Sequence, residues 1–241
     1  MNLIIDIGNT AVKYGVFKGQ EMLMHGSVFS DQINNLISDV EPFTIEKVIV
    51  SAVADIPGEL TALLNQQPVV INLDDRTFLP LTNAYETPQT LGKDRLSNAC
   101  GAVVLFPEQN VLVVDAGTCL KFDFIDAEGV YHGGAISPGL RMRFNALHQD
   151  TARLPLLEPV QHPTLIGHNT FGSIQSGVVN GMIAEINEII RQYEEQFSRL
   201  ELIITGGDSP FFLNQLKSRI FAAPTLTLLG LNAILECQPP S

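Results

Sequence analysis

The chain has few cysteines, few basic residues and no long apolar run, and each scarcity argues against a class of protein. Its three cysteines are odd in number, widely spaced and without a C-x-x-C pair, so we expect buried thiols rather than a disulfide framework or a zinc site. Only 14 Lys and Arg accompany 26 Asp and Glu, which gives a formal charge of −12. Nucleic acids and anionic membranes are polyanions and are therefore not expected as partners.

Segments that would direct the chain to or through a membrane are also missing from the sequence pattern. No run approaches 18 uncharged apolar residues, the length that a membrane-spanning helix needs. The sequence begins directly in an expected strand, with no basic segment followed by an apolar one, so we expect no signal peptide and a cytoplasmic protein. With 45% hydrophobic and 17% charged residues, the composition is globular, and the length allows one large domain or two small ones.

A repeated segment is the most informative feature that the sequence does contain. VLVVDAGTCLKFDF at 111–124 resembles NLIIDIGNTAVKYGVF at 2–17: an aliphatic run reaches Asp, then Gly and Thr, then one Lys. Each copy predicts a buried strand and a tight turn at which glycine lets the backbone approach a ligand. Thr and backbone N–H groups bind phosphate oxygens, whereas the Asp needs a cation between itself and phosphate. The pattern predicts a metal-bound nucleotide, although one copy alone would equally fit an ordinary hairpin.

The repeat also predicts the architecture. Two similar subdomains, 1–110 and 111–241, are expected in an α/β fold, with a cleft between them as the ligand site. The patterns predict strands at 3–6, 11–17, 21–29, 46–53, 68–73, 111–115, 119–125 and 200–207, and helices at 31–39, 95–106 and 173–197. A long polar loop is expected from 74 to about 92, and loops of that length are commonly functional.

A charge cluster follows this loop at the start of the middle helix. Lys93, Asp94 and Arg95 come directly after Gly92. One interpretation is a helix start at which the dipole favours Asp94. The other is a general base, with Asp94 accepting a hydroxyl proton while Arg95 or backbone amides hold the rest of a substrate.

Two features of the second half have a structural and a functional interpretation. Gly177 and Gly181 lie one turn apart on the long helix, where they would allow another backbone to approach, through internal packing or through a dimer contact. LELIITGG at 200–207 ends in paired glycines before Ser209 and Pro210, a typical helix start. Such a start can hold a phosphate or a ribose, or can be a plain strand-to-helix turn.

Taken in order, the segments DIGNT, GKDR, DAGTC, GGAISPG and TGGD resemble the type III pantothenate kinases, which belong to the acetate-kinase, sugar-kinase, Hsp70 and actin superfamily. The resemblance spans essentially the whole chain, and GKDR after a Tyr and a Pro is its most specific part. It implies two duplicated RNase H-like, actin-like subdomains with mixed sheets flanked by helices. It also implies ATP-dependent phosphorylation of pantothenate to 4'-phosphopantothenate, the first step of coenzyme A biosynthesis, by a homodimer whose pantothenate pocket is completed at the interface.

The same resemblance implies roles for individual residues. Asp94 would be the catalytic proton acceptor, and Asp115 would bind a monovalent cation, potassium or ammonium. Asp6 would hold the Mg²⁺ of ATP through water. The residues implied to bind ATP are Asp6, Ile7, Gly8, Asn9, Thr10, Ala11, Val12, Lys13 and Thr118, and those implied to bind pantothenate are Tyr85, Gly92, Lys93, Asp94, Arg95 and Thr170.

One position departs from the family pattern. Lys121 stands where the family often has a second Thr after the repeated motif. It would either place a fixed positive charge near the phosphates or point outward on an alternating strand.

Two other functions remain open from the sequence. One is another enzyme of the superfamily, a small-acid kinase or a phosphatase acting on polyphosphate, and the other is a non-catalytic, actin-like nucleotide-binding protein. GKDR after a Tyr-Pro loop favours the pantothenate kinase over the first. The 241 residues leave little room for the insertions of polymerising relatives.

Overall fold

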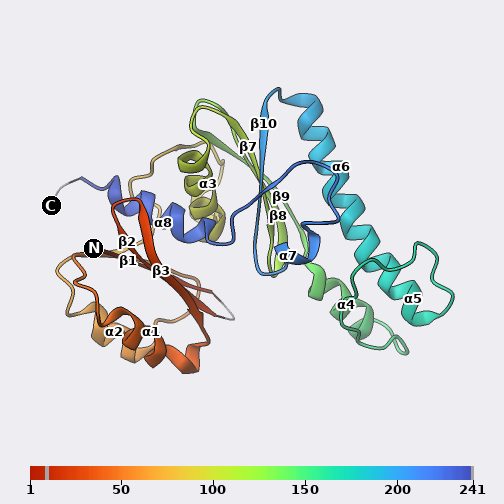
Figure 1. The fold of residues 1–241 in the computed structure, drawn as a ribbon, viewed down its shortest axis with the longest axis horizontal. Coiled ribbons are helices and arrows are strands. Elements are labelled where there is room, and N and C mark those ends of the chain that lie inside the picture. The colour runs from red at the N-terminus through yellow and green to blue at the C-terminus, as the bar shows by residue number, and fades with distance from the viewer. Residues whose placement is uncertain (9–10, 240–241) are drawn as a thin grey trace. The chain divides into compact units, whose positions relative to one another are not determined.

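The computed structural model describes residues 1–8 and 11–239. By its contacts the chain divides into two units, unit 1 with Met1–Pro107 and Thr225–Ser241, and unit 2 with Glu108–Pro224. Each unit has one main sheet (Figure 1). The helix α8, Leu226–Glu236, belongs by its contacts to unit 1, whereas the predicted range 111–241 assigned it to the second subdomain.

Unit 1 is built on a five-stranded mixed sheet with the order β3-β2-β1-β4-β5. The strand β1 pairs antiparallel with β2 and parallel with β4. The bounds are Asn2–Ile7 for β1, Val12–Lys18 for β2, Glu21–Val28 for β3, Lys47–Ala52 for β4 and Val70–Asn72 for β5. The long loop after β5 contains a two-residue strand, β6 at Thr82–Asn83, and a 3₁₀ turn at Pro88–Thr90.

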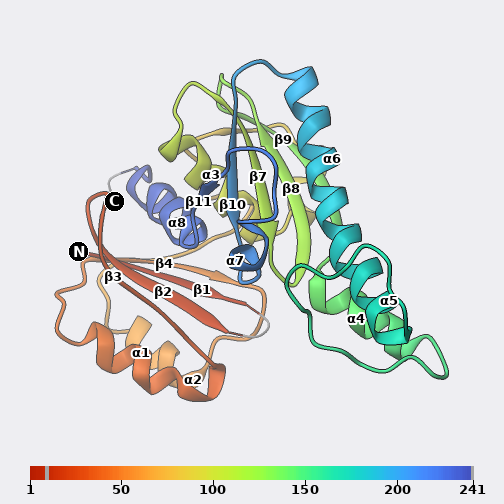
Figure 2. The same ribbon diagram turned by 45° about the vertical axis from the view of Figure 1, so that its right-hand side comes forward.

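Alternating side chains of β1 build a core on each face of this sheet, as a strand buried on both sides requires. Leu3 and Ile5 pack with α1, Ile33–Val40, and α2, Gly58–Leu64, which lie side by side along one face (Figures 1 and 2). Ile4 packs on the other face against apolar residues of α8. The helix α3, Lys93–Leu105, packs in turn against α8.

Unit 2 repeats the strand order of unit 1. Its sheet runs β9-β8-β7-β10-β11, with antiparallel pairs on the β9 side of β7 and parallel pairs on the β10 side. The bounds are Asn110–Ala116 for β7, Cys119–Ile125 for β8, Val130–Pro138 for β9, Leu200–Thr205 for β10 and Phe221–Ala222 for β11. The matching order and directions are what a duplicated unit would produce.

The helices of unit 2 also pack an apolar face against their sheet. A continuous helical stretch consists of α5, Thr170–Gln175, a π-helical turn, Ser176–Asn180, and α6, Gly181–Gln196, and α6 runs along the sheet (Figure 2). Its residues Met182, Ile186 and Ile190 are buried. The helices α4, Leu140–Gln149, and α7, Ser209–Phe212, complete the unit.

These observations confirm the predicted α/β class with two mixed sheets flanked by helices. In the described part of the chain no helix combines the length and hydrophobicity needed to cross a bilayer, and the cytoplasmic location stays a prediction. The expectation of three buried thiols is correct only for Cys100, whose burial raises the pKa of its thiol. Cys119 and Cys237 are partly exposed.

Candidate active site

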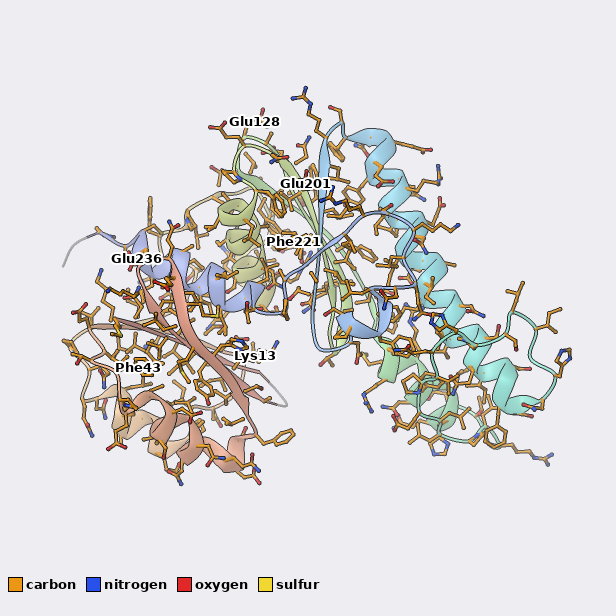
Figure 3. All side chains as sticks on the ribbon, viewed as in Figure 1. Lys13, Phe43, Glu128, Glu201, Phe221 and Glu236 are labelled. Atoms are coloured by element: carbon orange, nitrogen blue, oxygen red, sulfur yellow. The ribbon has the colours of Figure 1, made fainter. Side chains whose placement is uncertain are left out.

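The first repeated turn lies at the end of β1, where a carboxylate meets a tight backbone bend. The Gly8 N–H donates to Ala11 O at 3.0 Å, which closes the turn between β1 and β2. Asp6 lies opposite Lys13 across the antiparallel pair, so both side chains project from the same face of the sheet. Lys13 is labelled in Figure 3.

The predicted ATP residues of this turn differ in what they can offer a ligand. The side chains of Ile7 and Val12 are buried in the core, so only their backbones can contact a nucleotide. Asn9 and Thr10 lie outside the described residues. Ser51, which the sequence analysis missed, donates its hydroxyl to Asp6 Oδ1 at 2.9 Å. Its signal was its place at the carboxyl end of a parallel strand beside β1, where α/β sheets bind ligands.

The GKDR segment begins α3 and reaches the same edge of unit 1. Lys93 Nζ donates to Ala52 O at 3.2 Å, and Ala52 follows Ser51 at the end of β4. The backbone N–H of Arg95 donates to Asp94 Oδ1 at 2.9 Å. The structure therefore connects the predicted substrate segment with the strand end that contacts Asp6.

Arg95 and Tyr85 come together although ten residues separate them. The guanidinium carbon of Arg95 lies 5.6 Å from the centre of the Tyr85 ring, within the range of a cation–π interaction. Arg95 is only 4% exposed, so its side chain is held by its surroundings. Gly92 leaves room for the Asp94 carboxylate, because a Cβ at position 92 would lie 2.6 Å from Asp94 Oδ1.

The second repeated turn, in unit 2, brings three of the recognised segments together. DAGTC forms the turn itself, closed by the Gly117 N–H donating to Cys119 O at 3.2 Å. GGAISPG reaches it because a Cβ at Gly139 would lie only 2.2 Å from Thr118 O. TGGD reaches it because the Asp208 N–H donates to Ala116 O at 2.8 Å.

Gly206 shows why that packing needs glycine. Its φ of +93° is one that side chains rarely adopt, and a Cβ would lie 2.4 Å from the backbone of Ala116 and 2.5 Å from Asp115 Oδ1. Burial raises the pKa of the neighbouring Asp208, against the opposing charge of Arg141. Ser209 is the first residue of α7 rather than its N-cap. With only four residues, α7 does not provide the predicted phosphate-binding helix start.

Lys121 lies on β8, just after the second repeated turn. Its Nζ lies 2.8 Å from Asp115 Oδ2, and the two side chains are 12% and 10% exposed. The alternative in which Lys121 points outward is therefore wrong. A monovalent cation bound at Asp115 would have to share the carboxylate with this ammonium.

Thr170 is the predicted pantothenate residue that belongs to unit 2. It is exposed at the start of α5, on the rim of a hollow of about 470 Å³ whose lining is mostly apolar. On the neighbouring turns of the helix, a Cβ added at Gly177 or Gly181 would have no described atom within 4 Å. Internal packing is thus the wrong explanation for these two glycines.

The chain is similar over nearly its whole length to proteins of one family. The family model described as "Type III pantothenate kinase" matches residues 2–192. Proteins with that name from Christiangramia forsetii and Bacteroides fragilis are 44% and 43% identical to this chain, with 98% of each chain covered in both comparisons.

Solved structures with lower sequence identity share the fold. A Campylobacter jejuni protein described as a conserved putative Baf family transcriptional activator has a TM-score of 0.63 and 22% identity, with 97% of both chains covered. A glucokinase from an Antarctic psychrotroph has a TM-score of 0.53 and 12% identity, with 98% of this chain and 99% of the other covered. At these identities the likeness concerns the fold alone.

Proposed function

The chain belongs to the type III pantothenate kinase family, and from this premise we propose which of its residues carry out the reaction. The enzyme transfers a phosphoryl group from ATP to pantothenate, which gives 4'-phosphopantothenate and ADP in the first step of coenzyme A biosynthesis. In such transfers the protein mainly positions the reacting groups and neutralises charge.

Asp94 is the proposed proton acceptor. It takes the proton of the primary hydroxyl of pantothenate while that oxygen bonds to the γ-phosphorus and the bond from phosphorus to the leaving ADP oxygen breaks. The observation that carries this role is its place in the first turn of α3, between Lys93 and Arg95 and beside Gly92. A helix start favours negative charge, which suits the carboxylate that a base requires.

Arg95, Tyr85 and Lys93 are proposed to hold pantothenate. The contact between the guanidinium and the Tyr85 ring supports this role, because it fixes the direction of the N–H donors. A guanidinium in a fixed orientation binds a planar carboxylate, such as that of pantothenate, with two parallel hydrogen bonds.

Asp6 and Thr118 are proposed to act on the nucleotide. Mg²⁺, which neutralises the charge on the ATP phosphates, typically keeps several waters and takes one or two protein carboxylates. Asp6 suits that arrangement, because it is a carboxylate at a strand end whose Oδ1 is already oriented by the Ser51 hydroxyl at 2.9 Å. The backbone N–H groups of the first turn and the Thr118 hydroxyl are suited to phosphate oxygens.

A homodimer is proposed to complete the pantothenate site through Thr170. The segment around Thr170 exposes large apolar side chains, as an interface between protein chains does. The most exposed of them are Leu156, Val160, Leu165, Ile166 and Phe171, and Leu165 is 83% exposed. The open space beside Gly177 and Gly181 continues the same helical surface.

The predicted monovalent cation does not fit the residues present at Asp115. The carboxylate already has the ammonium of Lys121 at 2.8 Å, and a potassium ion there would place a second cation beside it. We assign no step of the reaction to a bound potassium or ammonium ion.

The function is tested by measuring ADP release from Mg-ATP by the purified full-length chain, with and without pantothenate. Chromatographic detection of ADP is preferable to an enzyme-coupled assay, because coupling enzymes have their own requirements for ions. Pantothenate-dependent ADP release together with phosphopantothenate, identified by mass, is expected. ADP release at a rate that does not depend on pantothenate, or hydrolysis of polyphosphate alone, would favour one of the other superfamily activities.

A further inference from the structure

The ion pair between Lys121 and Asp115 is a fixed charge arrangement at the second repeated turn. Both side chains are about nine-tenths buried, so water and salt screen their attraction much less than at a surface. Removing one partner of such a pair leaves an uncompensated buried charge. The ammonium of Lys121 is therefore held at the Asp115 carboxylate.

The register of the two sheets shows that this lysine has a counterpart in the first repeat. Asp115 lies opposite Lys121 across β7 and β8, as Asp6 lies opposite Lys13 across β1 and β2. Directly opposite residues of an antiparallel pair project from the same face. The strand pairing itself directs each lysine to the face of the sheet that carries the aspartate.

The surroundings of Asp115 place the lysine charge at the part of unit 2 that we propose for phosphate binding. Asp115 is the last residue but one of the buried strand β7, before Gly117 and Thr118, and Gly206 lies close to its Oδ1. A bare carboxylate here would repel a phosphate. The pair instead presents a neutralised carboxylate, with the positive charge covalently attached to the chain.

We propose that the Lys121 ammonium takes the place of a monovalent cation at the second turn, and that the enzyme consequently needs neither potassium nor ammonium. This inference rests on the proposed function for its effect on turnover. Lysine is suited to the role because its ammonium is a compact point charge with several donors. Because the lysine side chain is covalently attached, its charge cannot leave the site as a bound ion can. Catalysis therefore does not depend on the surrounding salt for this charge.

The first test compares the wild-type enzyme in potassium, sodium and choline chloride at equal ionic strength, with ADP detected directly. Pantothenate-dependent turnover is expected to agree within about twofold in the three salts, the variation that general salt screening allows. A tenfold or greater fall when potassium is replaced would overturn the proposal. Absence of pantothenate-dependent turnover in every salt would instead reject the proposed function.

A second test uses Lys121→Thr, which removes the ammonium and leaves room for an ion. This variant is expected to be at least about tenfold slower in choline than in potassium, since a missing charge at a phosphate site typically costs that much. Lys217→Thr is the matched control, because Lys217 is an exposed lysine of the same unit, and it should behave as the wild type in all three salts. If folded Lys121→Thr keeps full turnover in choline, Lys121 is not the required cation.

Melting temperatures provide a readout that does not depend on activity. Titration with potassium chloride, against choline chloride at the same ionic strength, should raise the melting temperature of Lys121→Thr specifically and leave the wild type without such a shift. A saturable potassium-specific shift in the wild type would contradict the proposal, even if the enzyme had no turnover. Should Lys121→Thr fail to fold, Lys121→Arg retains the charge and must remain independent of potassium for the proposal to stand.

Discussion

At the scale of single residues, the proposed chemistry depends most on Asp94. Its carboxylate accepts the backbone N–H of Arg95, and Gly92 leaves the space that a side chain would take from it. The helix-start interpretation and the proposed general-base role are compatible, because both place a carboxylate in the first turn of the helix, where negative charge is favoured. The two interpretations differ in what they predict for catalysis when the Asp94 carboxylate is removed.

Asp94→Asn removes the proton acceptor and preserves the shape of the side chain. We expect kcat to fall by about 10²- to 10⁴-fold, the contribution typical of a general base, while the dissociation constant for ATP changes little. Steady-state kinetics and calorimetric titration with ATP measure the two effects. Asp75→Asn, at an exposed aspartate of unit 1, is the matched control, and near-normal kcat in Asp94→Asn would reject the assignment.

At the scale of elements, the contact between α3 and α8 decides how GKDR is supported. The two helices approach so closely that a Cβ at Gly230 would lie 1.7 Å from Ser97 O, and one at Gly101 would lie 2.6 Å from Leu226 O. The colliding atoms are backbone oxygens, which cannot move as a flexible side chain does. The helix that carries the proposed base in its first turn therefore packs on α8 through one glycine of its own, Gly101, and one far away in the sequence, Gly230.

Gly230→Ala tests this packing. We expect a loss of unfolding free energy of about 3 kcal/mol or more, at the upper end of the range for overpacked cores, measured by urea denaturation. Gly58→Ala is the matched control, since Gly58 begins α2 with nothing within 4 Å of a Cβ, and replacing glycine in a helix gains about 0.5–1 kcal/mol. An equal, small effect of both substitutions would show that α3 and α8 adjust to the added methyl group.

At the scale of the whole molecule, local patterns predicted what depends on neighbours in sequence. Aliphatic runs located β1, β7 and β8 to within a residue or two, because the apolar residues that a strand buries on both faces are adjacent in the sequence. The close packing of Gly230 on Ser97 and the hydrogen bond of Ser51 to Asp6 depend on segments far apart in the chain. No local pattern encodes such contacts, so α8 was expected in the second subdomain and Ser51 was overlooked.

Lys121 illustrates the same limit at the candidate site. An alternating strand allows either face for a lysine, and only the register of β8 on β7, together with burial, decides that it meets Asp115. The family resemblance supplied the proposed functional roles and also a cation site at Asp115, where the structure has the ammonium of Lys121 instead. Roles transferred by resemblance are therefore most reliable where the side chain itself is kept.

The dimer is the remaining prediction at this scale, and paired variants test it. If Thr170 of one protomer completes the pocket that contains the partner's Asp94, Asp94→Asn and Thr170→Arg should each abolish turnover when present in both protomers. A heterodimer of one Asp94→Asn chain and one Thr170→Arg chain keeps one intact site, so random pairing in a twofold dimer restores about a quarter of wild-type activity. The two chains are co-expressed with different affinity tags, and the doubly tagged species is assayed separately.

The control for that experiment is a chain carrying both substitutions, co-expressed with Asp94→Asn, which leaves every site without its base and should remain inactive. Phe171→Asp, which puts a charge into the exposed apolar surface beside Thr170, should convert the dimer to a monomer in sedimentation and lower turnover in parallel. Restored activity without a doubly tagged species would point to exchange of the variants during purification. A stable dimer with no complementation would mean that Thr170 serves the site of its own chain, because each mixed dimer then contains two separately damaged sites.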